Sequence, residues 1–142
     1  MEKIPSFSKN HDILAVGLHK CTTDHGVTCW DLRFKKPNGG DYISPKALHT
    51  IEHILATVLR NSEKKENIVY FGPMGCRTGF YLLTVNMEYD EVLSLLKESC
   101  ALALTIDEVP GSKREECGNY LEHDLGDALS ELKKYSEILN NL

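Results

Sequence analysis

The residues of this chain whose types and spacing can do chemistry begin with the run His49-Thr50-Ile51-Glu52-His53. Two histidines at this spacing lie one turn apart on a helix, with β-carbons about 5–6 Å apart, so both imidazoles can hold one metal ion. Glu52 lies beside the pair and can act near the metal as an acid or base without being forced to ligate it. The run therefore predicts a metal site with a neighbouring carboxylate.

The element that must position this run is a helix, which we predict over residues 45–60. Ser44 followed by Pro45 is typical of a helix start, because a capping oxygen precedes a proline at the first helical position. Stepping about 100° per residue, the apolar side chains fall within an arc of roughly 140°; they are Ala47, Leu48, Ile51, Ile54, Leu55, Val58 and Leu59. The opposite side carries His49, His53, Thr57 and Arg60. The alternative is a solvated polar face that carries two histidines by coincidence.

A third ligand is needed, because two histidines alone make a weak metal site. Cys117 is the candidate, and Gly118 beside it fits a tight turn that presents the sulfur. Two histidines and one cysteine leave a fourth position open, which is typical of a catalytic rather than a structural site. His123 is the rival ligand, and three carboxylates also remain open as ligands: Glu115, Glu116 and Glu122.

A second reactive residue, Cys76, lies in the segment Gly72-Pro73-Met74-Gly75-Cys76-Arg77-Thr78-Gly79. Glycines on both sides let the backbone approach a ligand closely, and the neighbouring Arg77 can favour the thiolate. Cys76 can therefore move protons or act as a nucleophile; the alternative is a small buried hydrophobe. The remaining cysteines lie in strand or helix patterns, and we expect ordinary thiols at Cys21, Cys29 and Cys100.

Composition limits the classes of protein that the chain can belong to. With 142 residues it is long enough for one domain with a real core. Sixteen basic and 21 acidic residues give a net charge of −5, which argues against nucleic-acid and membrane-surface binding. No apolar run approaches a membrane span, and the first residues lack an apolar signal core. We therefore expect a cytoplasmic protein. Its five cysteines are an odd number with no tight Cys-x-x-Cys pair, and in a reducing compartment they should be free thiols.

The order of the expected elements predicts the fold class. We expect strands over 12–21 and 27–34, joined by a turn over 22–26 as an antiparallel hairpin. Further strands are expected over 68–71 and 78–87, and further helices over 89–104 and 125–139. The sequence thus predicts a single α+β domain over residues 1–142, a mainly antiparallel sheet with helices packed on one side.

Several of these motifs occur together and in order along the chain. They are Ser6-Phe7 with Asn10-His11, Asp31-Leu32-Arg33-Phe34, the His49–His53 run, Gly72 to Tyr81, and Glu116-Cys117-Gly118-Asn119-Tyr120. In this combination the chain strongly resembles the S-ribosylhomocysteine lyases, the LuxS family. The resemblance covers nearly the whole chain, and the stretch around Cys76 is its most specific part.

The resemblance implies an activity and a set of roles. The family cleaves the thioether of S-ribosylhomocysteine without redox chemistry, releasing homocysteine and 4,5-dihydroxy-2,3-pentanedione, the autoinducer-2 precursor used in quorum sensing. It implies one divalent metal per subunit, ferrous iron first with zinc or cobalt as alternatives, held at His49, His53 and Cys117. It implies proton transfer by Glu52 and Cys76 and substrate contacts from Ser6, His11 and Arg33. The family works as a homodimer with active sites at the interface.

The residue types suit that chemistry. A metal in an open site acts as a Lewis acid on carbonyl and hydroxyl oxygens, while a base and an acid move a proton from one carbon to the next. The carbonyl then migrates until β-elimination expels homocysteine. Arg60 lies on the same helix face as the two histidines, and we expect it to meet the homocysteine carboxylate of the substrate. Because this face is opposite the apolar arc, the Cys117 segment or a partner chain must cover it.

One departure from the family and two other classes remain. Many family members carry Asp-Ile-Ser where this chain has Tyr70-Phe71-Gly72, which removes one polar active-site residue; we expect an active enzyme with altered rate or contacts. A metallopeptidase of the H-x-x-E-H type would instead have Glu115 or Glu116 at the metal. A non-catalytic metal-stabilised module would have a closed four-ligand site, for instance His49, His53, Cys117 and His123.

Overall fold

The computed structural model describes residues 1–142 and contains four strands and three α-helices. The strands are β1 (Gly17–Asp24), β2 (Val27–Arg33), β3 (Ile68–Pro73) and β4 (Gly79–Thr84). The helices are α1 (Pro45–Arg60), α2 (Tyr89–Ala103) and α3 (Leu125–Asn140), and two short 3-10 helices are η1 (Pro5–Ser8) and η2 (Lys65–Asn67). Every predicted element is present. The first strand, however, begins at Gly17 rather than at residue 12, and its hairpin turns at His25 and Gly26, which both have positive φ.

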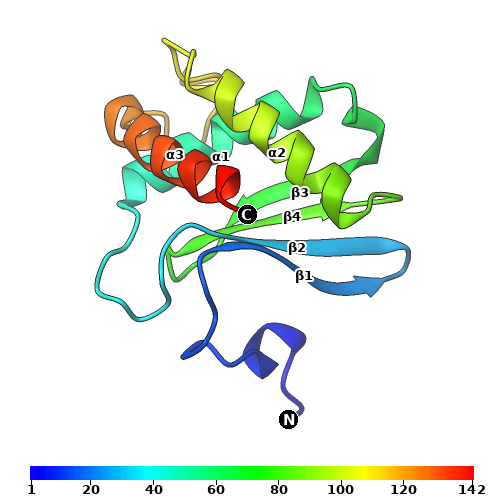
Figure 1. The fold of residues 1–142 in the computed structure, drawn as a ribbon. Coiled ribbons are helices and arrows are strands. Elements are labelled where there is room, and N and C mark those ends of the chain that lie inside the picture. Colours follow the sequence, from blue (N-terminus) through cyan, green and yellow to red (C-terminus); the bar gives the residue numbers. More distant parts are fainter.

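The four strands form one antiparallel sheet in the order β1-β2-β4-β3. Figure 1 shows the three helices together on one face of this sheet, with the N-terminal segment on the other. The predicted fold class, an antiparallel sheet with helices packed on one side, is therefore confirmed.

The core lies between the sheet and the helices. Alternate residues of β2 and the residue after it point toward the helices, and Phe34 stacks on Tyr135 of α3 with ring centroids 3.9 Å apart. The apolar arc predicted for α1 is buried, apart from Leu48, which is only partly buried. Thr50, which lies outside that arc, is fully buried, because the start of α3 covers it.

The face of the sheet that carries no helix is covered in part by the N-terminal segment. Ser6 Oγ lies 3.1 Å from Tyr81 Oη, and Lys9 Nζ lies 2.8 Å from Asp31 Oδ2. Asp31 and Arg33 are almost completely buried there and form a 2.6 Å ion pair. This face therefore holds a polar network, whereas the opposite face of the sheet packs against the apolar core.

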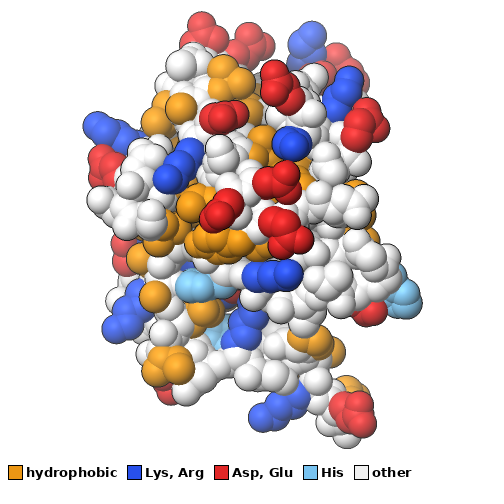
Figure 2. All heavy atoms as spheres, turned by 45° about the vertical axis from the view of Figure 1, so that its right-hand side comes forward, with side chains coloured by type: hydrophobic (Ala, Val, Ile, Leu, Met, Phe, Trp, Pro, Cys, Tyr) orange, Lys and Arg blue, Asp and Glu red, His pale blue; other side chains and the backbone are white.

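The surface over the helices is rich in acidic groups. Figure 2 shows acidic side chains gathered around hydrophobic ones on this part of the molecule. A groove between the end of α1 and α2 has an apolar floor that includes Val58 and Leu95, and Glu63, Glu91 and Glu98 are among its other lining residues. None of the predicted site residues lines this groove. No helix combines the length and apolar character that crossing a membrane requires.

Candidate metal centre

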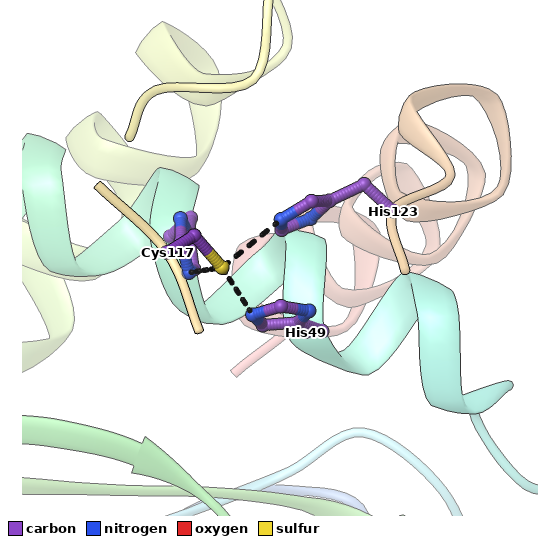
Figure 3. A group of neighbouring side chains, drawn as sticks. His49, Cys117 and His123 are labelled. Carbon is purple, nitrogen blue, oxygen red and sulfur yellow. Dashed lines mark hydrogen bonds between the residues drawn. The ribbon is translucent and has the colours of Figure 1, made fainter. Parts of the chain in front are cut away.

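Four side chains converge at the outer side of α1. The ligand atoms of His49, His53, Cys117 and His123 all lie within 4.8 Å of one another. Cys117 Sγ is 3.5 Å from His49 Nε2 and 3.9 Å from Nε2 of both His53 and His123. Figure 3 shows the sulfur pointing at His49 and His123, with the sheet further away. The three predicted ligands are thus brought together, and the rival ligand His123 lies beside them.

Local interactions fix the helix that carries the two histidines. Ser44 Oγ accepts a 3.2 Å hydrogen bond from the Ala47 N–H, as the predicted N-cap requires, and donates a 2.7 Å bond to Asp127 Oδ2. This second bond ties the start of α1 to α3. Cys117 comes from the segment between α2 and α3, in a turn where its N–H donates to Lys113 O at 3.1 Å. The cluster is therefore built from two segments, α1 and the segment between α2 and α3.

The two helix histidines are oriented by backbone carbonyls. Nδ1 of His49 lies 2.8 Å from Glu122 O, and Nδ1 of His53 lies 2.9 Å from Pro110 O. Because a carbonyl oxygen only accepts, each Nδ1 must carry the ring proton, so each Nε2 presents a lone pair to the cluster. Gly111 has φ +65°, and a β-carbon there would lie 3.3 Å from His53 Nδ1, so the close approach of this carbonyl requires glycine.

The donor set fits a divalent transition metal. Two imidazole nitrogens and one thiolate suit zinc, ferrous iron or cobalt, and no carboxylate joins the cluster. Two of the carboxylates considered as ligands are engaged elsewhere: Glu116 accepts from the Lys113 N–H, and Glu122 from Asn119. Burial and the nearby His49 and His53 lower the pKa of His123, so this imidazole is neutral at neutral pH.

Glu52 and Arg60 share α1 with the histidines. Glu52 is half-buried, one residue before His53. Arg60 is exposed near the end of the helix, where its Nη2 donates a 2.7 Å hydrogen bond to Val69 O of β3. One guanidinium nitrogen of Arg60 is thus bound to the edge of the sheet.

Cys76 is exposed in the turn between β3 and β4, and its surroundings differ from those expected. Its Sγ lies 3.0 Å from Thr78 Oγ1, which accepts a 2.7 Å hydrogen bond from Arg33 Nη1. The Arg77 guanidinium, which the sequence places next to Cys76, instead donates to Ile43 O at 2.9 Å. The buried Arg33, with its two hydrogen bonds to the Asp31 carboxylate, is therefore the arginine that reaches Cys76, through Thr78.

The two N-terminal candidates lie near this group. Ser6 is next to Tyr81, as described above, and Nδ1 of His11 donates a 3.0 Å hydrogen bond to Lys9 O, which leaves Nε2 free to accept.

Lys9 was not singled out from the sequence, although its Nζ also lies 2.9 Å from Cys21 Sγ. A hydrogen bond from the Cys29 thiol, together with this ammonium group, lowers the pKa of Cys21 to about 6 against the effect of burial. Cys21 thus lies in a more polar setting than its strand pattern indicated.

The predicted site residues thus form two groups on different faces of the chain. The four side chains of the candidate metal site lie on the outer side of α1, away from its apolar arc, together with Glu52 and Arg60. Cys76 and its partners Thr78 and Arg33 belong to the network on the sheet face that carries no helix. No hydrogen bond between the side chains of one group and those of the other is found.

An α+β domain with an antiparallel sheet and a His-His-Cys site that can hold a divalent metal is typical of a metal-dependent enzyme. Comparison with known proteins identifies the family. The family described as S-ribosylhomocysteinase (LuxS) matches residues 4–141, and the chain belongs to this family. Its activity is that of an S-ribosylhomocysteine lyase, a metal-dependent carbon–sulfur lyase.

Relatives across several bacterial groups agree with this assignment. The S-ribosylhomocysteine lyase of Borreliella afzelii (strain PKo) is 46% identical, and the alignment covers 100% of this chain and 95% of the relative. The enzymes of the same name from Clostridium acetobutylicum (strain ATCC 824) and Finegoldia magna (strain ATCC 29328) are 41% and 38% identical, over 100% of this chain and 94% of each relative. The similarity therefore extends over the full chain.

Proposed function

We propose that this chain cleaves S-ribosylhomocysteine by moving the carbonyl along the ribose and then eliminating homocysteine, which leaves 4,5-dihydroxy-2,3-pentanedione, the autoinducer-2 precursor. The observation that carries the proposal is the convergence of His49, His53 and Cys117 beside Glu52 in a chain of this family. A metal held there supplies Lewis acidity to the carbonyl and hydroxyl oxygens of the substrate. The whole chain, residues 1–142, acts as one lyase domain in the cytoplasm.

Glu52 and Cys76 carry the proton transfers. One of them removes the proton from the carbon next to the carbonyl, and a proton returns one carbon along, which shifts the carbonyl by one position. In the last step a base removes the proton beside the carbon that bears sulfur. That electron pair forms the new double bond while the carbon–sulfur bond breaks toward sulfur, and the homocysteine thiolate takes up a proton.

Four residues position the substrate: Ser6, His11, Arg33 and Arg60. The free Nε2 of His11 and the Ser6 hydroxyl suit the hydroxyl groups of the sugar. Arg60 suits the homocysteine carboxylate, because an exposed guanidinium can pair with it. Because Arg33 is buried and donates a hydrogen bond to Thr78, it also holds Thr78 beside Cys76.

Ferrous iron is the metal that we propose for the cell, with zinc or cobalt able to replace it. The ligand set of two neutral imidazoles and a thiolate accepts all three ions. Metal analysis of protein isolated without oxygen and without added metal tests this assignment. Iron in place of zinc in such a preparation supports it, and stoichiometric zinc would contradict it.

We also propose a homodimer in which each active site combines the metal cluster of one chain with Cys76 of the partner subunit. The separation of the two groups of site residues within one chain supports this arrangement. Exposed apolar side chains near the helix-free sheet face also support it, since Phe7, Val69 and Tyr70 are 68%, 40% and 52% exposed.

The experiment that tests the function is a free-thiol assay with S-ribosylhomocysteine and anaerobic protein loaded with ferrous iron or cobalt. We expect the wild type to release homocysteine, and Cys76→Ala and Glu52→Gln to lose the activity while keeping the metal. Mixing the two inactive variants under conditions of subunit exchange should restore activity, because one heterodimer site then has both residues intact. No thiol release from metal-loaded wild type would refute the lyase, and no restoration on mixing would refute the shared site.

A further inference from the structure

His123 lies in the metal cluster, but its ring is not oriented like those of the other histidines. The rings of His49 and His53 are nearly perpendicular at 87°, with centroids 4.7 Å apart. The ring of His123 instead stacks on His49, with centroids 4.0 Å apart and an interplanar angle of 23°. Ligands around a tetrahedral ion diverge from it, and two rings stacked face to face cannot both direct their Nε2 lone pairs at one ion.

The hydrogen bonds at Nδ1 also distinguish His123 from the other two. Nδ1 of His49 and of His53 faces a carbonyl oxygen, whereas Nδ1 of His123 lies 3.0 Å from Thr50 Oγ1. A carbonyl can only accept, but a hydroxyl can also donate. His123 is therefore the one histidine of the cluster whose Nδ1 can accept a hydrogen bond, in the tautomer where Nε2 carries the ring proton.

The surroundings of Thr50 allow this donation. Its Oγ1 accepts a 3.0 Å hydrogen bond from the Asp124 N–H, which occupies one acceptor position. The hydroxyl proton can go to Lys46 O at 2.9 Å or to His123 Nδ1. The Lys46 carbonyl has its regular helical partner in the N–H four residues on, whereas His123 Nδ1 has no other partner. Thr50 is fully buried, so water does not compete for its proton.

We propose that His123 is a positioning residue of the metal centre, whose Nε2–H donates a hydrogen bond to the Cys117 thiolate and leaves the fourth metal position open for substrate. Nε2 of His123 lies 3.9 Å from Sγ, the same distance as Nε2 of His53, so the stacked ring and the Thr50 contact are what distinguish His123. A metal-bound cysteine is a thiolate and accepts such a bond. The inference deepens the proposed function and rests on its metal site, because an open position is what a lyase requires and a closed four-ligand site would lack.

The hydrogen bond from His123 would orient the Cys117 sulfur toward the metal. Outer-shell hydrogen bonds orient a ligand, and their removal typically weakens metal binding about 10–100-fold. The chain Thr50, His123, Cys117 links the buried side of α1 to the metal through a defined tautomer. Thr50 thus acts on the metal centre without touching it.

The test uses protein loaded with Co²⁺, whose sulfur-to-cobalt charge-transfer absorption reports on the thiolate. We expect His123→Leu and Thr50→Val to move this band to longer wavelength, because the sulfur electrons rise in energy when the hydrogen bond is lost. Thr50→Ser keeps the hydroxyl and should keep the wild-type band, which separates the bond from a general packing effect. We expect cobalt affinity to fall about 10–100-fold in the first two variants. A band that is unchanged in both would overturn the inference.

A second measurement tests whether His123 is instead a metal ligand. In proton spectra of the Co²⁺ protein, each histidine bound through Nε2 keeps a solvent-exchangeable Nδ1–H with a large paramagnetic shift. We expect two such resonances, both retained in His123→Leu. Three resonances, of which His123→Leu loses one, would overturn the inference. If the spectra are as expected but S-ribosylhomocysteine is not cleaved, the lyase proposal fails and the His123 contact stands.

Discussion

Arg33 Nη1 donates a 2.7 Å hydrogen bond to Thr78 Oγ1, and the same oxygen lies 3.0 Å from the sulfur of Cys76. Because a guanidinium can only donate, the hydroxyl proton of Thr78 remains available to the sulfur. A buried cation is in this way coupled to an exposed thiol through a single hydroxyl group.

Replacing this hydroxyl should lower both activity and stability. We expect Thr78→Val to reduce the rate of thiol release by roughly 10-fold, a part of the 10²–10⁴-fold that a positioned proton-transfer group contributes. The free energy of unfolding should fall by about 1–3 kcal/mol, since a buried Arg33 donor loses its partner. Urea unfolding and the thiol assay measure the two effects. Thr78→Ser is the matched control; a wild-type rate in Thr78→Val would mean that the contact does not assist Cys76.

Arg60 should affect substrate binding rather than the chemical step. We expect Arg60→Ala to raise KM roughly 10-fold or more with little change in kcat, because a hydrogen bond to a charged group contributes about 1.5–3 kcal/mol. Arg60→Lys keeps the charge and should show a smaller increase. Steady-state kinetics of thiol release measure both constants, and an unchanged KM in Arg60→Ala would remove Arg60 from the site.

Two glycines of neighbouring strands should respond very differently to substitution. A β-carbon at Gly79 would collide with the backbone carbonyl of Leu32, which cannot move without separating β2 from β4. A β-carbon at Gly72 would meet only the ring of Tyr70, which is 52% exposed and can rotate away. We expect Gly79→Ala to lose about 3 kcal/mol or more of stability and Gly72→Ala less than about 1 kcal/mol. Equal losses in urea unfolding would contradict this explanation.

Stability should fall at alkaline pH partly because of Cys100. Burial raises the pKa of this thiol from 9.0 to about 12, so above pH 9 the unfolded chain loses a proton that the folded chain keeps. The free energy of unfolding then decreases by up to about 1.4 kcal/mol per pH unit. Cys100→Ala should show a shallower decrease between about pH 9 and pH 10 in urea unfolding with reductant present. The same slope in wild type and variant would show that the Cys100 thiol does not titrate as its burial requires.

Much of the metal site could be predicted because its signals are local. A serine–proline start and a helical apolar period fix α1 with the bounds found in the structure, and the spacing of His49 and His53 places both on one face. The fold class followed from the order of the elements in the same way. The beginning of β1 did not, because residues before Gly17 have no pairing partner: β2 ends at Arg33, which lies opposite Gly17.

The remaining features depend on contacts between distant parts of the chain. Arg77 is next to Cys76 in sequence, yet its backbone is left-handed, with φ of 61°. Its side chain donates a hydrogen bond to Ile43 O instead of approaching Cys76. The bond between Thr50 and His123 joins residues 73 positions apart. No spacing rule predicts such a contact, so the sequence could name His123 only as a rival ligand.

The segment between α2 and α3 has little regular structure of its own, and the metal site holds it in place. It contributes the Pro110 and Glu122 carbonyls and the Cys117 sulfur to the two histidines of α1. A bound ion would therefore hold the longest irregular part of the chain in place. Loss of the metal would expose this segment to proteases. The lifetime of the enzyme in a cell would then follow the supply of its metal, and scarcity would lower the amount of enzyme as well as its turnover.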